Sequence, residues 1–328
     1  MTREAWPELP WRAWGDTLAT LHMWTQIVGK LRMAATPPAS HWGHAPLSVT
    51  PRGLTTSAVP YGTRLFQIDL DLVDHSLLVA DSDGRSVRME LAAKPVADFY
   101  RELLAALASL DIELSILARP VEVVDAIPFD DHYTHASYDR DHVRAFHGAL
   151  IQAHRLLGIF QAKFVGKTSP VQFFWGSFDL TTERFSGGRA PTHPGGAPNV
   201  ADWVMEEAYS HELSSAGWWA THPEVGPAFF AYTYPEPRSL AAATVRPAPA
   251  LYHPELREFI LRYDDVRVLK DPDAAVIAFF EDCYARGAEL GDWPRPPLES
   301  ADYPVGLPRR PWSTSTTALG PASGQRAR

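Results

Sequence analysis

Cysteine is nearly absent from this chain of 328 residues, which has a single one, Cys283. A lone cysteine excludes an internal disulfide framework and a metal cluster built on cysteine. Positive charge is also scarce, because 30 Lys and Arg residues face 39 Asp and Glu residues, for a formal net charge of −9. We therefore expect no basic surface for binding nucleic acid.

Long apolar segments are missing as well. No run approaches the roughly 20 apolar residues that cross a bilayer. Residues 1–7 lack the charged and then apolar pattern of a secretory signal. We expect a cytoplasmic protein that binds neither a membrane nor nucleic acid. The sequence leaves both the cofactor and the oligomeric state open.

The motifs of several well-known sites do not occur in the chain. Gly-x-Gly-x-x-Gly and the P-loop pattern, which cradle phosphates, are absent. His-Glu-x-x-His and Gly-x-Ser-x-Gly, which mark a zinc hydrolase and a serine nucleophile, are absent too. The sequence therefore predicts an architecture but names no reaction.

Aromatic residues and proline are plentiful, with 11 Trp and 29 Pro. Apolar residues recur at spacings of three and four over residues 14–31 and 143–164, which predicts two amphipathic helices. Phe66–Leu72 alternates apolar and polar residues, as in an antiparallel strand with one solvated face. Asp81–Gly84 predicts the turn of a hairpin. The combination indicates an α+β fold.

Three further segments have less regular patterns. Ser169–Leu180 is apolar on both faces, which predicts one central strand covered on both sides. Asn199 is predicted to cap a helix that ends near Gly217, a natural residue to follow a helix. Residues 112–117 are expected to form a strand that closes the first half of the chain.

Short motifs occur twice in the same order, which we interpret as an internal duplication. The pairs are Val-Gly-Lys at 28–30 and 165–167, Trp-Gly at 42–43 and 175–176, and Arg followed by Gly at 52–53 and 184–187. The duplication predicts two similar helix–sheet–helix halves around an antiparallel or mixed sheet. The predicted parts are a first half over residues 1–125, a second half over 126–298 and a disordered tail over 299–328.

Several longer motifs carry a family resemblance. They are Leu21–Lys30, Arg52–Ser57, Phe173–Leu180, Arg184–Gly187, His193–Gly196 and Tyr209–Gly217. In these motifs the chain resembles a bacterial family of unknown function, domain of unknown function 5996, up to about residue 295. The resemblance implies one intact member of that family and implies no activity.

If the two halves pack about a pseudo-twofold axis, cations at matching positions would meet in one aromatic-walled cleft. Such a cleft would suit a small acidic, phosphorylated or otherwise polar metabolite. The candidate ligand-binding residues are Lys30, Arg52, Lys167, Trp175, Arg184, Ser186 and His193. The loop around His193 would form a flap. Lysine and arginine at helix ends also complement the helix dipole, which is the structural alternative.

His211 and Glu212 are the candidate catalytic residues. On a helix over residues 200–216 both side chains would face the core, where Glu212 would need a cation. Arg184 and Lys167 are the natural partners. Such a cluster predicts a binding protein or an enzyme, although a structural ion network would look the same.

Two other functions stay open. Thirteen histidines allow a metal-dependent hydrolase or oxidoreductase that uses His132, His135, His193, His211 and Glu212. The first two lie in a loop and not on a rigid element, so ordinary loop histidines are the simpler interpretation, and no metal ligand is assigned. The third alternative is a non-catalytic interaction module whose aromatic residues form only the core.

Overall fold

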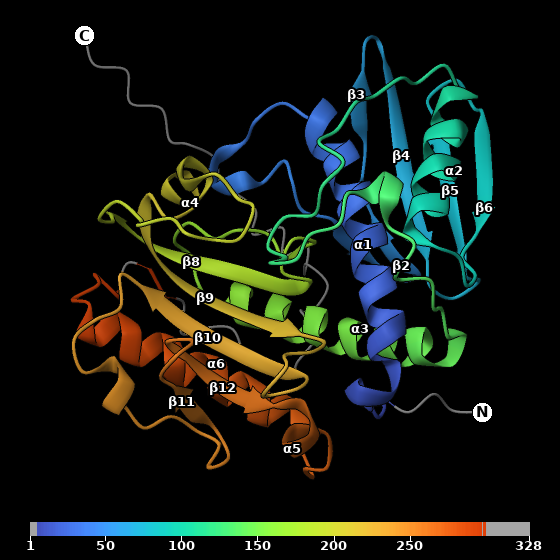
Figure 1. Ribbon diagram of the computed structural model, residues 1–328. Helices are drawn as coiled ribbons and strands as arrows, with labels where there is room; N and C mark the ends of the chain where they lie inside the picture. The colour runs from blue at the N-terminus through green and yellow to red at the C-terminus, as the bar shows by residue number, and fades with distance from the viewer. Residues whose placement is uncertain (1–4, 297, 300–328) are drawn as a thin grey trace, which may run out of the picture.

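The computed structural model describes residues 5–296, 298 and 299. The fold is α+β, as predicted, with helices packed on two antiparallel sheets (Figure 1). The tail predicted to be disordered lies outside the described residues except for residue 299. No described helix combines the length and the apolar character needed to cross a membrane.

The first half contains two helices and a sheet with the strand order β1-β2-β4-β5-β6, in which β3 also pairs with β4. Its elements are α1 (Trp11–Ala35), the 3-10 turn η1 (Ser40–Trp42), β1 (Ser48–Thr50), β2 (Gly53–Thr55), β3 (Val59–Tyr61), β4 (Arg64–Asp71), β5 (Ser76–Asp81), β6 (Ser86–Glu90) and α2 (Val96–Ala108). Residues 109–139 form a connector that includes the 3-10 turn η2 (Phe129–Asp131).

The predicted amphipathic patterns explain the first half. In β4 the buried residues alternate with partly exposed ones, so Phe66, Ile68 and Leu70 face the core. Helices α1 and α2 pack together through Trp24 and Phe99, whose rings stack 4.6 Å apart. Both helices lie on one side of the sheet in Figure 1. Among the described residues, no helix lies over the opposite face of this sheet in Figure 1.

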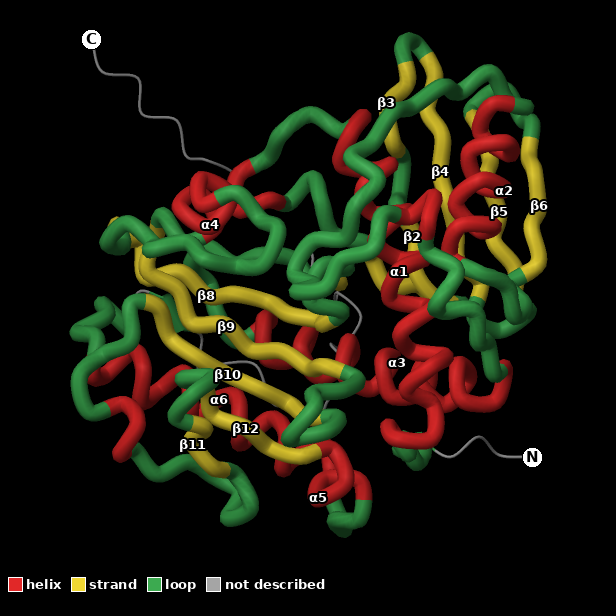
Figure 2. Tube along the Cα trace, viewed as in Figure 1, coloured by secondary structure: helices red, strands yellow, loops and turns green. Residues whose placement is uncertain are grey.

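The second half contains a sheet with the strand order β11-β12-β10-β9-β8-β7 (Figure 2). Its elements are α3 (Arg140–Ala162), β7 (Gln172–Phe174), β8 (Asp179–Arg189), α4 (Asp202–Ala208), β9 (His211–Trp219), β10 (Ala228–Tyr234), the 3-10 turn η3 (Leu240–Ala242), β11 (Leu251–His253), β12 (Glu258–Arg262), α5 (Tyr263–Arg267) and α6 (Pro272–Leu290). Asp139 caps α3, because its carboxylate accepts hydrogen bonds from the amides of Asp141 and His142.

The two faces of the second sheet differ in their cover. Trp218 of β9 stacks on Phe146 of α3, with 6.0 Å between ring centroids, and Phe229 of β10 packs edge-on against Phe280 of α6 at 5.9 Å. Helices α3 and α6 therefore cover one face with apolar side chains. On the other face, alternate residues of β8 and β9 point toward α4, η1 and the connector.

The two sheets meet edge to edge. Leu47, just before β1, and Phe173 in β7 exchange two backbone hydrogen bonds of 2.9 Å each. A single hydrophobic core contains residues from both halves. The boundary near residue 125 stays a prediction, because nothing in this packing separates two domains.

Two sequence predictions for the second half are wrong in part. Residues 169–180 form a hairpin and not one central strand: β7 ends at Phe174, the chain turns through residues 175–178, and β8 begins at Asp179. The helix predicted over 200–216 stops at Ala208, and His211 begins strand β9. Residues 214–218 of β9 are buried on both faces of the sheet. The small and apolar residues there therefore carry no alternation that would reveal a strand.

The motif pairs behind the predicted duplication do not occupy matching positions. Lys30 lies inside α1, which continues to Ala35, whereas Lys167 follows the end of α3 at Ala162. Trp42 precedes β1, whereas Trp175 follows β7. Residues 112–117, predicted as a strand, have no regular structure. Both halves do place a helix before and after an antiparallel meander, and their common origin stays a hypothesis.

Candidate functional site

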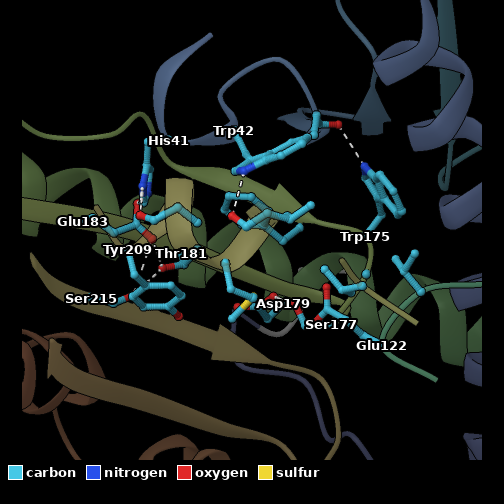
Figure 3. Close-up of a pocket in the computed structure, with 18 of the residues that line it drawn as sticks. His41, Trp42, Glu122, Trp175, Ser177, Asp179, Thr181, Glu183, Tyr209 and Ser215 are labelled. Atoms are coloured by element: carbon cyan, nitrogen blue, oxygen red, sulfur yellow. Dashed lines mark hydrogen bonds and ion pairs between the residues drawn. The ribbon is translucent and has the colours of Figure 1, made fainter. Parts of the chain in front are cut away.

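A cavity of about 680 Å³ lies over the face of the second sheet that α3 and α6 leave free. Its walls come from both halves: η1 and the end of α1, the connector near Glu122, helix α4, and strands β8, β9, β10 and β12. We call this cavity the sheet pocket (Figure 3). Its size is typical of small-molecule sites.

Strand β8 supplies a row of polar side chains to the floor of the sheet pocket. Asp179, Thr181 and Glu183 are two residues apart, so all three point to the same face of the sheet. Ser215 of β9 lies beside Thr181, with 2.8 Å between the two hydroxyl oxygens. The intervening β8 residues, such as Leu180, point to the opposite face and join the core.

An ion pair closes one end of the pocket. Nε2 of His41 lies 3.2 Å from Oε2 of Glu183, and both side chains are largely buried. Nδ1 of His41 lies 3.0 Å from the carbonyl oxygen of Ala208 at the end of α4. Because both neighbours can only accept a hydrogen bond, an imidazole protonated on both nitrogens fits this position.

The charges of this pair reinforce each other. Burial alone would lower the pKa of His41, but the Glu183 carboxylate outweighs it and raises that pKa. Burial would likewise raise the pKa of Glu183, but His41 and the hydroxyls of Ser169 and Thr181 lower it. The pair is therefore an internally neutralised unit.

His41 and Trp42 also tie the first half to the second. Both have a left-handed backbone, with φ of 55° and 54°, an uncommon conformation for residues other than glycine. The backbone amide of His41 donates to Glu207 at 2.9 Å, and Nε1 of Trp42 donates to the carbonyl oxygen of Val204 at 3.0 Å. These bonds hold η1 against α4 above the sheet, as Figure 3 shows for Trp42.

Three further carboxyl groups line the pocket without a cationic partner among the described residues. Burial raises the pKa of Asp179 to about 7, although a hydrogen bond from Ser177 opposes the shift. Neighbouring protein atoms displace water from the carboxyl group of Glu122, and this desolvation raises its pKa to about 7, although the residue as a whole is exposed. Glu258 of β12 has a pKa raised to about 8, first by burial and then by the charge of Asp179.

Aromatic rings form much of the remaining wall. Trp219 stacks on Phe230 at 4.7 Å, and Gly217 permits this arrangement, because a Cβ at that position would lie 2.2 Å from the Phe230 ring. The hydroxyls of Tyr209 and Tyr232 are 2.8 Å apart. Two tryptophans complete the upper wall in Figure 3. They are Trp42 and Trp175, and the latter donates from Nε1 to the carbonyl oxygen of Ala45 at 2.8 Å.

Two of the residues predicted to bind a ligand line the sheet pocket. Lys30 is 3% exposed, and its Nζ lies 5.8 Å from the ring centroid of Trp175. Burial lowers the pKa of Lys30, and this residue makes no ion pair with a described carboxylate. Gly29 lets Trp175 approach α1, because a Cβ there would lie 2.2 Å from the indole ring.

The other predicted cations lie elsewhere. Arg184 points to the opposite face of the sheet, where it pairs with Glu281 of α6 at 3.1 Å and stacks on the Phe160 ring at 3.5 Å. Arg52 pairs with Asp71 at the surface of the first sheet. Lys167 is exposed. The prediction that cations converge on one cleft is therefore wrong for these three residues.

The predicted catalytic residues are also separated from Arg184. His211 is exposed at the start of β9, and Glu212 accepts a hydrogen bond of 2.5 Å from Ser186. Neither lines the sheet pocket, and the predicted contact of Glu212 with Arg184 is wrong because β9 is a strand. His193 stacks on Tyr209 at 4.6 Å, outside the pocket lining.

The histidines proposed for a metal do not form a ligand set. His132 and His135 pack together with ring centroids 4.8 Å apart beside the start of α2. His193 belongs to the loop before α4. Within the described residues, no group of three or more His, Cys, Asp and Glu side chains could hold a metal ion.

The sequence contained a signal for part of this site. The spacing of Asp179, Thr181 and Glu183 indicates one polar strand face, but the reading of residues 169–180 as a covered strand obscured it. His41, Glu122 and Glu258 come from distant segments. No local pattern connects them.

A comparison with protein families matches residues 6–300 to a family of unknown function, DUF5996. The chain belongs to this family. The resemblance noted in its motifs is thereby confirmed, whereas a bacterial origin stays a prediction. A search of curated proteins found no match for this DUF5996 protein, and a search of solved structures found none either. Family membership brings no activity with it.

Proposed function

We propose that this protein binds a small organic molecule in the sheet pocket. The observation that carries the proposal is the enclosure of Asp179 and Glu258, two partly buried carboxyl groups without a cation, in an aromatic-walled cavity. Burying such groups costs free energy unless they are paired or hydrogen-bonded. A ligand that completes their interactions would offset that cost.

Three features support binding over a purely structural role. The cavity lies where the two halves meet, which is a common place for ligand sites. Its polar groups are fixed, since Glu183 is held by His41 and Thr181. The backbone of His41 and Trp42 is in an uncommon conformation beside the cavity, and such conformations gather at functional sites.

The test is a thermal-shift screen of cationic, neutral and anionic small molecules on the full chain. A ligand that binds only the native state raises the melting temperature. Ala201 lines the pocket and is exposed, so Ala201→Trp should fill the entrance and abolish the shifts. Ala274→Trp, at an exposed position of α6 outside the lining, is the control and should preserve them.

Hits that persist in Ala201→Trp would bind elsewhere and would contradict the proposal. A complete absence of hits would contradict it too, and would favour the alternative of a non-catalytic interaction module. Ligand-observed NMR with the same two variants gives an independent reading of each hit.

A second candidate function is acid–base catalysis on the bound molecule. It is favoured by Asp179 and Glu122, whose pKa values of about 7 suit proton transfer near neutral pH. Each screening hit would be incubated with the protein and followed by mass spectrometry. Asp179→Asn should retain binding and lose turnover. If the wild-type protein left every hit chemically unchanged, binding would be the only function supported.

A further inference from the structure

We propose that the ligand of the sheet pocket is an organic cation, an amine or quaternary ammonium compound, held by Asp179 and Glu258 among the aromatic rings. This inference rests on the proposed function and specifies its ligand class. It differs from the expectation of an acidic or phosphorylated metabolite, which depended on cations that lie outside the pocket.

The balance of charge in the pocket favours a cation. Four carboxyl groups line it, and they are Glu122, Asp179, Glu183 and Glu258. Lys30 and His41 are the described lining residues that can be positive near neutral pH, and His41 is already neutralised by Glu183 at 3.2 Å. His222 also lines the pocket, but burial lowers its pKa. With all carboxyl groups ionised, the pocket would therefore carry a net negative charge.

Glu258 provides the most specific sign of a missing partner. Its Oε2 atom is fully enclosed and has no hydrogen-bond partner among the described residues. The ionisable groups that act on or near it are Asp179 of β8, Tyr232 of β10, Tyr209 after α4 and His253, its register partner in β11. The Nε2 atom of His253 lies 3.7 Å from Glu224, and none of the four hydrogen-bonds to Oε2 of Glu258. An enclosed oxygen of this kind needs a donor, which an ammonium group would supply.

The rings around these carboxyl groups suit a cation as well. Trp219 and Phe230 stack at 4.7 Å, and Phe230 and Tyr232 lie nearly parallel at 6.3 Å, so the sheet offers a row of ring faces. A cation over such faces is stabilised by the ring quadrupole, most strongly when it is shielded from water. Aromatic walls combined with carboxylates are the usual means of binding ammonium groups.

Protonation lets the pocket avoid an unfavourable charge when no cation is bound. Burial raises the pKa values of Asp179 and Glu258 to about 7 and about 8, so near neutral pH Glu258 is mostly protonated and Asp179 is protonated in part. A bound cation would favour their ionised forms. Binding would then release protons, and each proton released leaves one carboxylate to pair with the cation.

The inference is tested with cations of three sizes: choline, phenyltrimethylammonium and spermidine. Choline has a neutral isostere with a tert-butyl group in place of the trimethylammonium group. Phenylacetate serves as an anion of similar size to the aromatic probe. Affinities for the full chain are measured by calorimetry at about pH 8. At least one cation should bind at least about tenfold more tightly than its neutral or anionic counterpart.

Two pocket variants with opposite charge effects sharpen the test. Glu258→Gln should weaken cation binding about tenfold and leave a neutral probe unaffected. Lys30→Met removes a positive charge and should preserve or strengthen cation binding. Circular dichroism and melting temperature show whether each variant is folded. If Glu258→Gln is not folded, Asp179→Asn takes its place.

The outcomes separate this inference from the proposed function. The inference would be overturned if phenylacetate or the neutral isostere bound at least as well as the cations. If Ala201→Trp also abolished that binding, the pocket would still be supported as a ligand site. Loss of binding in Lys30→Met would also overturn the inference, and it would indicate that the ligand of the pocket is an anion. No binding of any probe would overturn both.

Discussion

The two sheets of this protein each have one face packed on helices, but their other faces differ. On the first sheet, Gln67 and Asp69 of β4 remain partly exposed and bond to each other at 2.9 Å. On the second sheet, Asp179, Thr181 and Glu183 of β8 have the same alternation, yet α4, η1 and the connector enclose them. The same strand pattern therefore leads to a solvated surface in one half and a pocket in the other.

The difference shows that the pKa of a carboxyl group depends on its burial and on whether a cation pairs with it, more than on the residue type. Burial alone would raise the pKa of Asp71 at the end of β4, but hydrogen bonds from Arg52 and from the amides of Asp74 and Val73 lower it. Asp179 has no cationic partner among the described residues, and burial raises its pKa to about 7. Substitutions in the two halves of the molecule test this contrast.

The largest expected effect concerns the ion pair on the helix-covered face of the second sheet. Arg184 is 1% exposed, so Glu281→Ala would leave a buried cation without its carboxylate. We expect a loss of about 3 kcal/mol or more in the free energy of unfolding, measured by urea denaturation. Asp74→Ala, which breaks an exposed pair with Arg52, is the control and should barely move the midpoint. Equal losses of stability in Glu281→Ala and Asp74→Ala would contradict the contrast between buried and exposed ion pairs.

The next effect is a pH dependence of opposite sign in the two sheets. Glu258 has a folded pKa of about 8, above its unfolded value of 4.5, so the wild type loses stability as pH rises between these values. Gln does not titrate. The stability of Glu258→Gln relative to wild type should therefore rise between about pH 5 and pH 9, by at least about 1.4 kcal/mol, the free energy of one pKa unit.

Asp71→Asn is the counterpart in the first sheet. The pKa of Asp71 is lowered on folding, so its contribution is present above the unfolded value of 3.8 and is lost as pH falls. The variant should be less stable than wild type at neutral pH and approach it in acid. Melting curves over the same pH series measure both variants. A relative stability that changes in the same direction with pH in both would refute the assigned environments.

A smaller effect is expected from the neutral polar residues of the two open faces. The Thr181 hydroxyl lies 2.9 Å from Glu183 and 2.8 Å from Ser215, and all three residues are buried. Thr181→Val should cost about 1–2 kcal/mol, because it leaves buried groups without a partner. Gln67→Val on the first sheet should change stability by less than about 0.5 kcal/mol. Chemical denaturation of both variants gives the comparison.

Much of the fold could be predicted from local patterns. Residues 14–31 and 143–164 lie in α1 and α3 because their apolar residues follow the period of a helix. The alternation of Phe66–Leu72 and the turn at Gly84, with φ of 83°, gave β4 and the β5–β6 hairpin. Strand β9 was missed because residues 214–218 are buried on both faces and have no period.

The site was predictable only in part. Lys30 and Trp175 were identified from the repeated Val-Gly-Lys and Trp-Gly motifs, and both line the sheet pocket although these motifs do not occupy matching positions in the fold. Arg184 was assigned to the wrong face, because the break between β7 and β8 changes which residues share a side of the sheet. Glu258 and Glu122 reach the pocket through tertiary packing of distant segments, which a single sequence does not encode in any local pattern.

We predict that the carboxyl groups of the second sheet that line the pocket bind a cation. The most direct test is the number of protons exchanged when phenyltrimethylammonium binds at about pH 7, measured by calorimetry in buffers of different ionisation enthalpy. This probe does not titrate, so any proton comes from the protein. We predict release of protons on binding, and less release in Glu258→Gln. Binding without proton release, or with proton uptake, would contradict the account.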